Sequence, residues 1–182
     1  MTGHQQLVDL AARWLWGFKK CSLVVTELSS SSPEQPDAIG FRFGHSWLVE
    51  CKTSRSDFMA DADKHFRRYD GHAMGTHRYY LAPPGIIGVT ELPEGWGLLE
   101  QKGKHVYIAR EATFQHATDR RYEIEMMTSC FRRVMGGLPK TIRCKSYTID
   151  GKGEPRAALY INQMAEQAQE TSAGYKGEDL FT

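Results

Sequence analysis

The sequence predicts an α/β domain in which a mixed central sheet is flanked by helices. Three observations lead to this prediction. A helical apolar pattern opens the chain, strand-like segments follow it, and a second helical pattern separates these segments from another strand at residues 77–82. The order strand, helix, strand makes a βαβ unit, whose two strands we expect to be parallel.

The composition is that of one soluble globular domain. The chain has 182 residues, and its 41% hydrophobic and 25% charged content allows a real core and disfavours disorder. No apolar run approaches the ~18 residues of a membrane span. The N-terminus lacks the features of a secretion signal, and the four cysteines lack metal-ligand spacing. We therefore expect a cytoplasmic protein with free thiols and no membrane partner.

The first elements are a helix and a strand. Residues 22–28 are rich in β-branched side chains and carry Glu27, and a polar loop of serines and prolines follows to Pro36. The apolar positions of the preceding helix recur at helical spacing: Leu7, Leu10, Ala11, Trp14, Leu15 and Phe18.

Residues 37–52 are expected to form a β-hairpin that turns at Gly44-His45. Counting outward from that turn places Asp37 opposite Lys52 and Ile39 opposite Glu50. Side chains two apart on a strand share a face, so Glu50 and Lys52 point the same way, with Asp37 beside them. The apolar residues before Glu50 indicate an inner strand rather than a wet edge.

The chain then becomes helical, with Ser54–Asp57 resembling a capping box. His77–Ala82 is the next strand, and residues 96–101 and 105–110 are expected to form a hairpin. The helix that begins at this cap and precedes the strand at residues 77–82 carries its apolar face at Phe58, Ala62, His65, Phe66 and Tyr69.

Three units are expected along the chain. Residues 1–115 form the core, residues 116–170 an α+β extension packed on it, and residues 171–182 a flexible tail. The extension contains a helix capped by Thr118-Asp119, a strand within 141–149 and a helix that begins near Pro155. The first helix is predicted to bury one stripe: Ile124, Met127, Phe131 and Val134.

Asp37, Glu50 and Lys52 are the candidate site. Two carboxylates and an ammonium on one sheet face suit a hard divalent cation and an activated water, which is the chemistry of a metal-dependent phosphodiesterase. Glu-x-Lys is also a common tripeptide, and it is often a solvated face or a cross-strand ion pair. Charges at the end of a buried strand nevertheless need a partner or a metal.

The order of elements and these residues resemble the PD-(D/E)XK nuclease superfamily, and within it the MmcB-type DNA-repair endonucleases. The resemblance covers roughly residues 5–110. The chain departs from the family pattern at His65, where relatives often have an aromatic residue, usually tryptophan. The segments that carry it are Asp37, Val49-Glu50-Cys51-Lys52-Thr53-Ser54, Asp57-Phe58, Asp61, Asp63-Lys64, Tyr69, Arg78-Tyr79-Tyr80-Leu81-Ala82 and Gly97-Leu98-Leu99.

The resemblance implies a restriction-endonuclease-like core and a role for each residue. Asp37 and Glu50 would hold Mg²⁺ or Mn²⁺, with the backbone carbonyl of Cys51 as a third ligand. Lys52 would position the attacking water, help to deprotonate it and offset charge on the phosphate. Glu27 would reach a metal-bound water or a second ion, or it is an exposed strand carboxylate.

The implied partner is DNA, although the net charge is only +1. The expected phosphate contacts, each of which could equally be a surface charge, are Lys64, Arg67, Arg68 and Arg55.

The expected function is therefore a divalent-metal-dependent nuclease that hydrolyses DNA, in DNA repair, recombination or the biology of mobile elements and phages. The alternative is a module on the same fold that binds nucleic acid or protein without cutting. A homodimer or a protein partner bound through the C-terminal third also stays open. RNA is a further open substrate, and no aromatic-rich platform for single strands is evident in the sequence.

Overall fold

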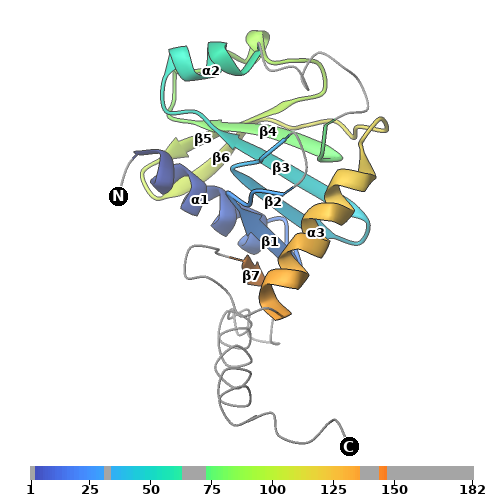
Figure 1. The fold of residues 1–182 in the computed structure, drawn as a ribbon. Coiled ribbons are helices and arrows are strands. Elements are labelled where there is room, and N and C mark those ends of the chain that lie inside the picture. Colours follow the sequence, from blue (N-terminus) through green and yellow to red (C-terminus); the bar gives the residue numbers. More distant parts are fainter. Residues whose placement is uncertain (1–2, 31–33, 63–72, 136–143, 147–182) are drawn as a thin grey trace, which may run out of the picture.

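The structure, a computed structural model, describes residues 3–30, 34–62, 73–135 and 144–146 (Figure 1). A seven-stranded sheet lies at its centre, in the order β6-β5-β4-β3-β2-β1-β7. Its strands are β1 (Leu23–Thr26), β2 (Ala38–Arg42), β3 (His45–Cys51), β4 (His77–Ala82), β5 (Gly97–Lys102), β6 (His105–Arg110) and β7 (Cys144–Ser146). The helices are α1 (Gly3–Gly17), α2 (Arg55–Ala62) and α3 (Arg120–Met135), with a short 3₁₀ turn η2 at Val89–Glu91.

The sheet is mixed, as the sequence predicts. β3 pairs with β4 and β4 with β5 in parallel, and the other four pairings are antiparallel. β3 is the middle strand, which confirms the prediction of an inner strand. The α/β class, the parallel βαβ unit and the β5–β6 hairpin are likewise confirmed. Within the predicted strand at 141–149, Cys144–Ser146 extends the sheet beside β1.

α1 covers one face of the sheet. Leu7, Trp14 and Leu15 are buried there together with Val49 and Tyr79 from the strands. The chain packs closely on β2: a Cβ added to Gly40 would lie 2.6 Å from the sulfur of Cys21, which follows the helix, and 3.3 Å from the Cβ of Leu15 in α1. Only glycine fits at that point. The helix ends at Gly17, so the predicted burial of Phe18 is wrong, and this ring is 60% exposed.

The β2–β3 hairpin turns one residue earlier than predicted. Phe43 and Gly44 form the turn, both with positive φ (48° and 77°), as a two-residue type I′ turn requires. Ile39 therefore pairs with Leu48 rather than Glu50, and Ala38 pairs with Val49. Moving the turn by one residue changes the pairing by two. Since the side-chain period is also two, every side chain stays on its predicted face.

α2 and α3 cover the other face, where Leu48 and Tyr80 are buried with Phe58 of α2 and Met126 of α3. The cap of α2 forms as expected, because the Ser54 hydroxyl accepts the amide hydrogen of Asp57. The part of the predicted second helix beyond Ala62, with His65, Phe66 and Tyr69, lies outside the described residues.

The predicted buried stripe of α3 is wrong at three of its positions, and the side chain of the fourth, Val134, lies outside the described residues. Ile124 is 57% and Phe131 65% exposed, and Met127 is only half-buried. The helix begins as predicted, because Asp119 accepts the amide hydrogen of Arg121. Among the described side chains of α3, the buried ones are instead Glu123, Met126, Ser129 and Cys130.

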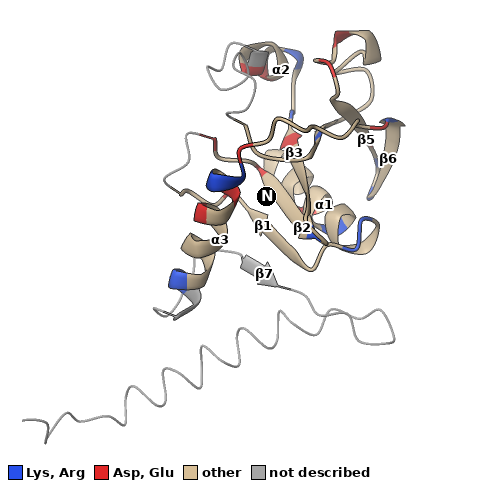
Figure 2. Cartoon of the chain, turned by 90° about the vertical axis from the view of Figure 1, so that its right-hand side faces the viewer, with Lys and Arg blue, Asp and Glu red and all other residues tan. Residues whose placement is uncertain are grey.

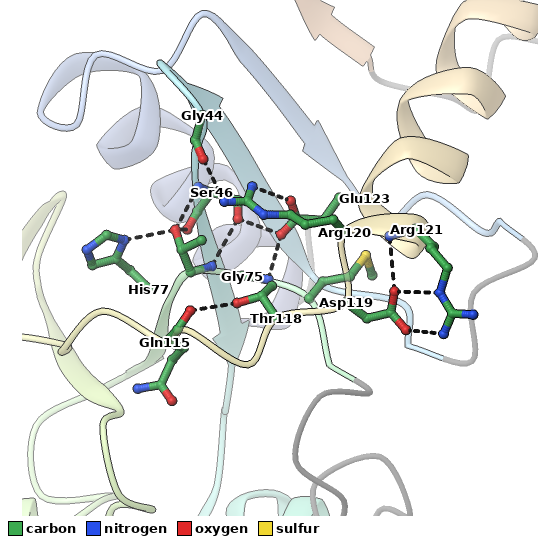
Figure 3. A network of polar contacts seen from close by, with 12 residues as sticks. Gly44, Ser46, Gly75, His77, Gln115, Thr118, Asp119, Arg120, Arg121 and Glu123 are labelled. Atoms are coloured by element: carbon green, nitrogen blue, oxygen red, sulfur yellow. Dashed lines mark hydrogen bonds and ion pairs between the residues drawn. The ribbon is translucent and has the colours of Figure 1, made fainter.

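Polar contacts to Glu123 attach α3 to the sheet (Figure 3). One carboxylate oxygen accepts hydrogen bonds from the Ser46 hydroxyl at 2.5 Å and from the Gly75 amide at 3.0 Å. The other oxygen accepts from Arg120 at 3.0 Å, and Arg120 also donates to the carbonyl of Gly44 at the hairpin tip. Glu123 thus joins α3, the start of β3 and the segment before β4.

We predict that Glu123→Ala lowers the free energy of unfolding by about 2–4 kcal/mol, because it leaves two buried donors without an acceptor. Urea denaturation followed by circular dichroism measures this. Glu125→Ala, on the exposed side of the same helix, is the matched control and should change stability by less than about 0.5 kcal/mol. Equal effects of the two variants would contradict the role of Glu123.

Candidate functional site

Asp37, immediately before β2, is fixed to the end of β3. Its Oδ2 accepts the amide hydrogen of Cys51 at 2.7 Å. The pairing of Ala38 with Val49, continued by one residue, places Asp37 beside Glu50 rather than opposite Lys52 as predicted. The two carboxylates that the sequence singles out are therefore brought to one corner of the sheet.

Lys52 is buried between two carboxylates. Its Nζ donates to Oε2 of Glu50 at 3.2 Å and to Oδ1 of Asp61 at 3.0 Å, and the residue is only 4% exposed. The backbone amide of Lys52 donates to the carbonyl of Leu81, so β4 fixes the chain where β3 ends. The ammonium therefore has a defined position.

Asp61 of α2 is a site residue that the sequence analysis does not assign. Its other oxygen accepts a hydrogen bond from the Tyr80 hydroxyl at 2.7 Å, and its side chain is fully buried. The Tyr80 ring stacks on Trp96 with centroids 4.5 Å apart and contacts the edge of Phe58 at 5.1 Å. Only the packing of α2 onto β4 reveals that Asp61 reaches Lys52.

The surroundings of Lys52 keep it charged. Burial by itself lowers the pKa of the ammonium, but Glu50 and Asp61 overcome that effect and raise the pKa above its ordinary value. Lys52 is therefore protonated at neutral pH. An ammonium can donate hydrogen bonds and offset negative charge, whereas it cannot accept a proton from water. Of the expected roles, the structure favours charge stabilisation and positioning.

Glu27 and Asp37 meet at His4, in the first turn of α1. Its Nε2 lies 3.4 Å from Oε1 of Glu27 and 3.5 Å from Oδ1 of Asp37. The Glu27 amide also donates to the carbonyl of Asp37 at 3.1 Å. The side chain of Glu27 is half-exposed, so its oxygen is accessible to solvent. His4 is a second residue that the sequence analysis does not assign, since nothing there shows where α1 begins over the sheet.

The four predicted charged residues of this corner all affect the pKa of the Cys51 thiol. Its thiol pKa is raised well above the ordinary value, first by burial and then by Asp37 and Glu50; Lys52 opposes the shift and Glu27 adds to it. All four predicted charges thus act on one position. The thiol stays protonated and buried, so the side chain of Cys51 is not a nucleophile.

The carboxylate oxygens of Asp37 and Glu50 are the type of ligand that a hard cation prefers. In the described ranges, no three side chains of His, Cys, Asp or Glu are already arranged around one point as metal ligands. Mg²⁺ retains several waters and is commonly held by one or two carboxylates, so a ready-made cluster of three is not required. Asp37, just before β2, and Glu50 of β3 are two neighbouring carboxylates of the kind that could serve.

The predicted phosphate contacts lie partly outside the structure. Lys64, Arg67 and Arg68 are not among the described residues. Arg55 is exposed but forms a two-pronged ion pair with Glu91 and also donates to the carbonyl of Ile86. Figure 2 shows the charged residues of the described chain spread over several elements.

Comparisons with known proteins support the fold alone. The chain matches no model of a protein family and no curated protein. It is similar to the solved structure of a protein of unknown function from Silicibacter pomeroyi, at 24% identity and a TM-score of 0.55. The match covers 75% of this chain and 91% of that one. In the described part of this chain, no helix has the length and apolar character needed to cross a membrane.

We predict that Lys52→Ala lowers the free energy of unfolding by about 3 kcal/mol, since it leaves two buried carboxylates facing each other without a cation. Urea denaturation at pH 7 measures the change. The exposed Lys102, which pairs with Glu100, provides the control Lys102→Ala, expected within about 0.5 kcal/mol of wild type.

A double-mutant cycle that combines Lys52→Ala with Asp61→Asn measures the coupling free energy between Lys52 and Asp61. Removing one carboxylate should relieve part of the penalty, so the two changes together should be less harmful than the sum of the two by about 1–3 kcal/mol. Strict additivity would mean that the pair at 3.0 Å does not contribute to folding.

Proposed function

We propose that this protein is a divalent-metal-dependent nuclease that hydrolyses phosphodiester bonds in DNA. The observation that supports the proposal best is the junction at the end of β3, where the Asp37 carboxylate bonds the Cys51 amide between Glu50 and Lys52. Two carboxylates and a charged ammonium at one corner suit a reaction in which negative charge grows on a phosphate.

Each residue has a separate part in this proposal. Asp37 and Glu50 would hold Mg²⁺ or Mn²⁺, with the Cys51 carbonyl as a further oxygen ligand and Glu27 oriented toward a metal-bound water. When bound, the cation would lower the pKa of a water and neutralise phosphate charge. Lys52 would donate hydrogen bonds to the phosphoryl oxygens.

Asp61 would keep Lys52 in place. In the structure Lys52 is shared between Glu50 and Asp61, so a change at Glu50 still leaves the ammonium a buried partner. In the reaction, water oxygen forms a bond to phosphorus, one ester P–O bond breaks, and the departing oxygen takes up a proton. The charge on Lys52 would offset the negative charge that grows on the five-coordinate phosphate.

We predict that the purified protein cleaves labelled DNA with Mg²⁺ or Mn²⁺ and not with EDTA. Asp37→Asn, Glu50→Gln and Lys52→Ala should each lower the rate by about 10²–10⁴-fold, since each removes a charge from the transition state. Single-stranded, duplex and branched substrates should be compared, with an RNA oligonucleotide in parallel.

The control for the cleavage assay is Glu100→Gln, which alters a strand glutamate on β5 that pairs with Lys102. It should cleave like wild type. Assays should be run at a temperature where denaturation shows every variant to be folded. Equal cleavage by wild type and Lys52→Ala would identify a contaminating nuclease and contradict the proposal. Binding of DNA in EDTA, with no product under any metal, would favour the non-cleaving alternative.

We also predict that Mn²⁺ binds the free protein at this corner. Isothermal titration calorimetry should show binding to wild type and at least about tenfold weaker binding to Asp37→Asn, because a carboxylate ligand is lost. Glu100→Gln is again the matched control. If Asp37→Asn binds Mn²⁺ as wild type does, the cation is not held by Asp37.

A further inference from the structure

Four aromatic rings gather at the amino-terminal ends of β3 and β4, far from Lys52. Trp47 and His77 are paired in the sheet, and their rings stack with centroids 5.2 Å apart and planes at 13°. His45 lies 5.7 Å from Trp47 and 5.6 Å from His77. The ring of Phe114, in the loop after β6, is nearly perpendicular to both histidine rings, with centroids 5.5 Å from each. We call these four residues the ring cluster.

The ring cluster lies on the face that α1 covers but is not itself covered. The next side chains along the same face, Val49 and Tyr79, are fully buried under α1. In contrast, His45 is exposed, Phe114 is 41% exposed, and Trp47 and His77 are half-buried. Aromatic surface is thus open to solvent where the cover of the helix ends.

The backbone and side chains around the ring cluster are held in place (Figure 3). His77 Nδ1 is within 3.1 Å of the Thr76 hydroxyl. The amide of Gln115 donates to the carbonyl of Thr76 at 2.7 Å, which fixes the loop that carries Phe114. Arg120 bonds the carbonyl of Gly44 at 2.7 Å, beside His45. Rings ordered in advance lose little entropy when a ligand binds.

Two cations, Lys19 and Arg42, and one carboxylate, Glu111, lie at the same end of the sheet as the ring cluster. The pKa of His77 is lowered, first by burial and then by His45 and Lys19, so its ring is neutral at pH 7. Arg42 donates to the carbonyl of Lys19, which brings a second cation to the same end of the sheet. The acidic neighbour, Glu111, is in an ion pair with Lys19 at 3.6 Å.

We propose that the ring cluster is a stacking site for the bases of single-stranded nucleic acid. Every base has a flat face that can stack on an exposed ring, and its phosphates are anions that suit Arg42 and Lys19. These two features, flat rings and neighbouring cations, favour an unpaired strand over an apolar peptide. The inference rests on the proposed function, to which it adds a binding subsite, and it is testable without cleavage.

The position of the ring cluster predicts how it would act. His45 and Lys52 are seven residues apart along one strand and its extension, about 23 Å at ~3.3 Å per residue. Trp47 and Glu50 also point to opposite faces. Bases bound at the ring cluster are therefore remote from the reacting phosphate. Losing this site should raise KM for single-stranded substrates and leave kcat unchanged.

The test is fluorescence anisotropy of a labelled oligothymidylate of about 12 nucleotides, in EDTA so that no cleavage occurs. The double variant His45→Ala/Phe114→Ala should bind at least about tenfold more weakly than wild type, because two stacking surfaces are lost. The conservative variant Phe114→Tyr should bind as wild type does. The logarithm of the binding constant should fall with the logarithm of salt by about 0.7 for each phosphate neutralised, a shallow slope for two cations.

Phe131→Ala is the control, since it removes a phenylalanine from the outer side of α3 that is even more exposed (65%) than Phe114 (41%). Thermal denaturation should show that all variants are folded. Equal weakening by Phe131→Ala and the double variant, or no weakening by either, would overturn the proposal. Metal-dependent cleavage without oligothymidylate binding would overturn the ring-cluster site and leave the nuclease. Ring-dependent binding without cleavage would support the ring-cluster site and contradict the nuclease.

Discussion

The structure at the carboxyl end of β3 depends on the interaction of the buried Lys52 ammonium with Glu50 and Asp61. A charge in a protein interior is tolerated only when partners compensate its lost hydration, and here Glu50 and Asp61 do so together. Asp61 is in turn fixed by Tyr80, whose ring is packed between Trp96 and Phe58. The position of one polar atom therefore follows from the packing of α2 against the sheet.

Much of this corner could be predicted from the sequence because strand geometry has a period of two. An error of one residue in the turn at Gly44 left Asp37, Glu50 and Lys52 on the same face, since it moved the register by two. His4 and Asp61 could not be found in this way. They reach the corner from α1 and α2, and their place depends on how each helix packs on the sheet, which no local pattern encodes.

The ring cluster shows the same limit at the other end of β3. The sequence contains no aromatic-rich segment there, because the rings come from positions 45, 47, 77 and 114 on two strands and a loop. The parallel pairing of β3 with β4 brings the first three together. One strand thus carries a buried ion pair where it ends and exposed rings where it begins, on opposite faces of the sheet.

The orientation of α3 shows why an apolar pattern predicted the wrong face. Burying Ile124 and Phe131 would gain about 1.5–3 kcal/mol each. However, β3 presents the Ser46 hydroxyl to this helix, and the segment before β4 presents the Gly75 amide. Each of these donors costs about 1–3 kcal/mol if it is buried without an acceptor. The free energy gained by burying these two apolar side chains is therefore similar to the free energy lost by leaving the two donors without an acceptor. Met126 and Cys130 are buried on the same side as Glu123, so that face combines apolar packing with hydrogen bonding. The outer face, which carries Ile124 and Phe131 beside Glu125, has no such donors to satisfy on the sheet side among the described residues, and it remains in solvent.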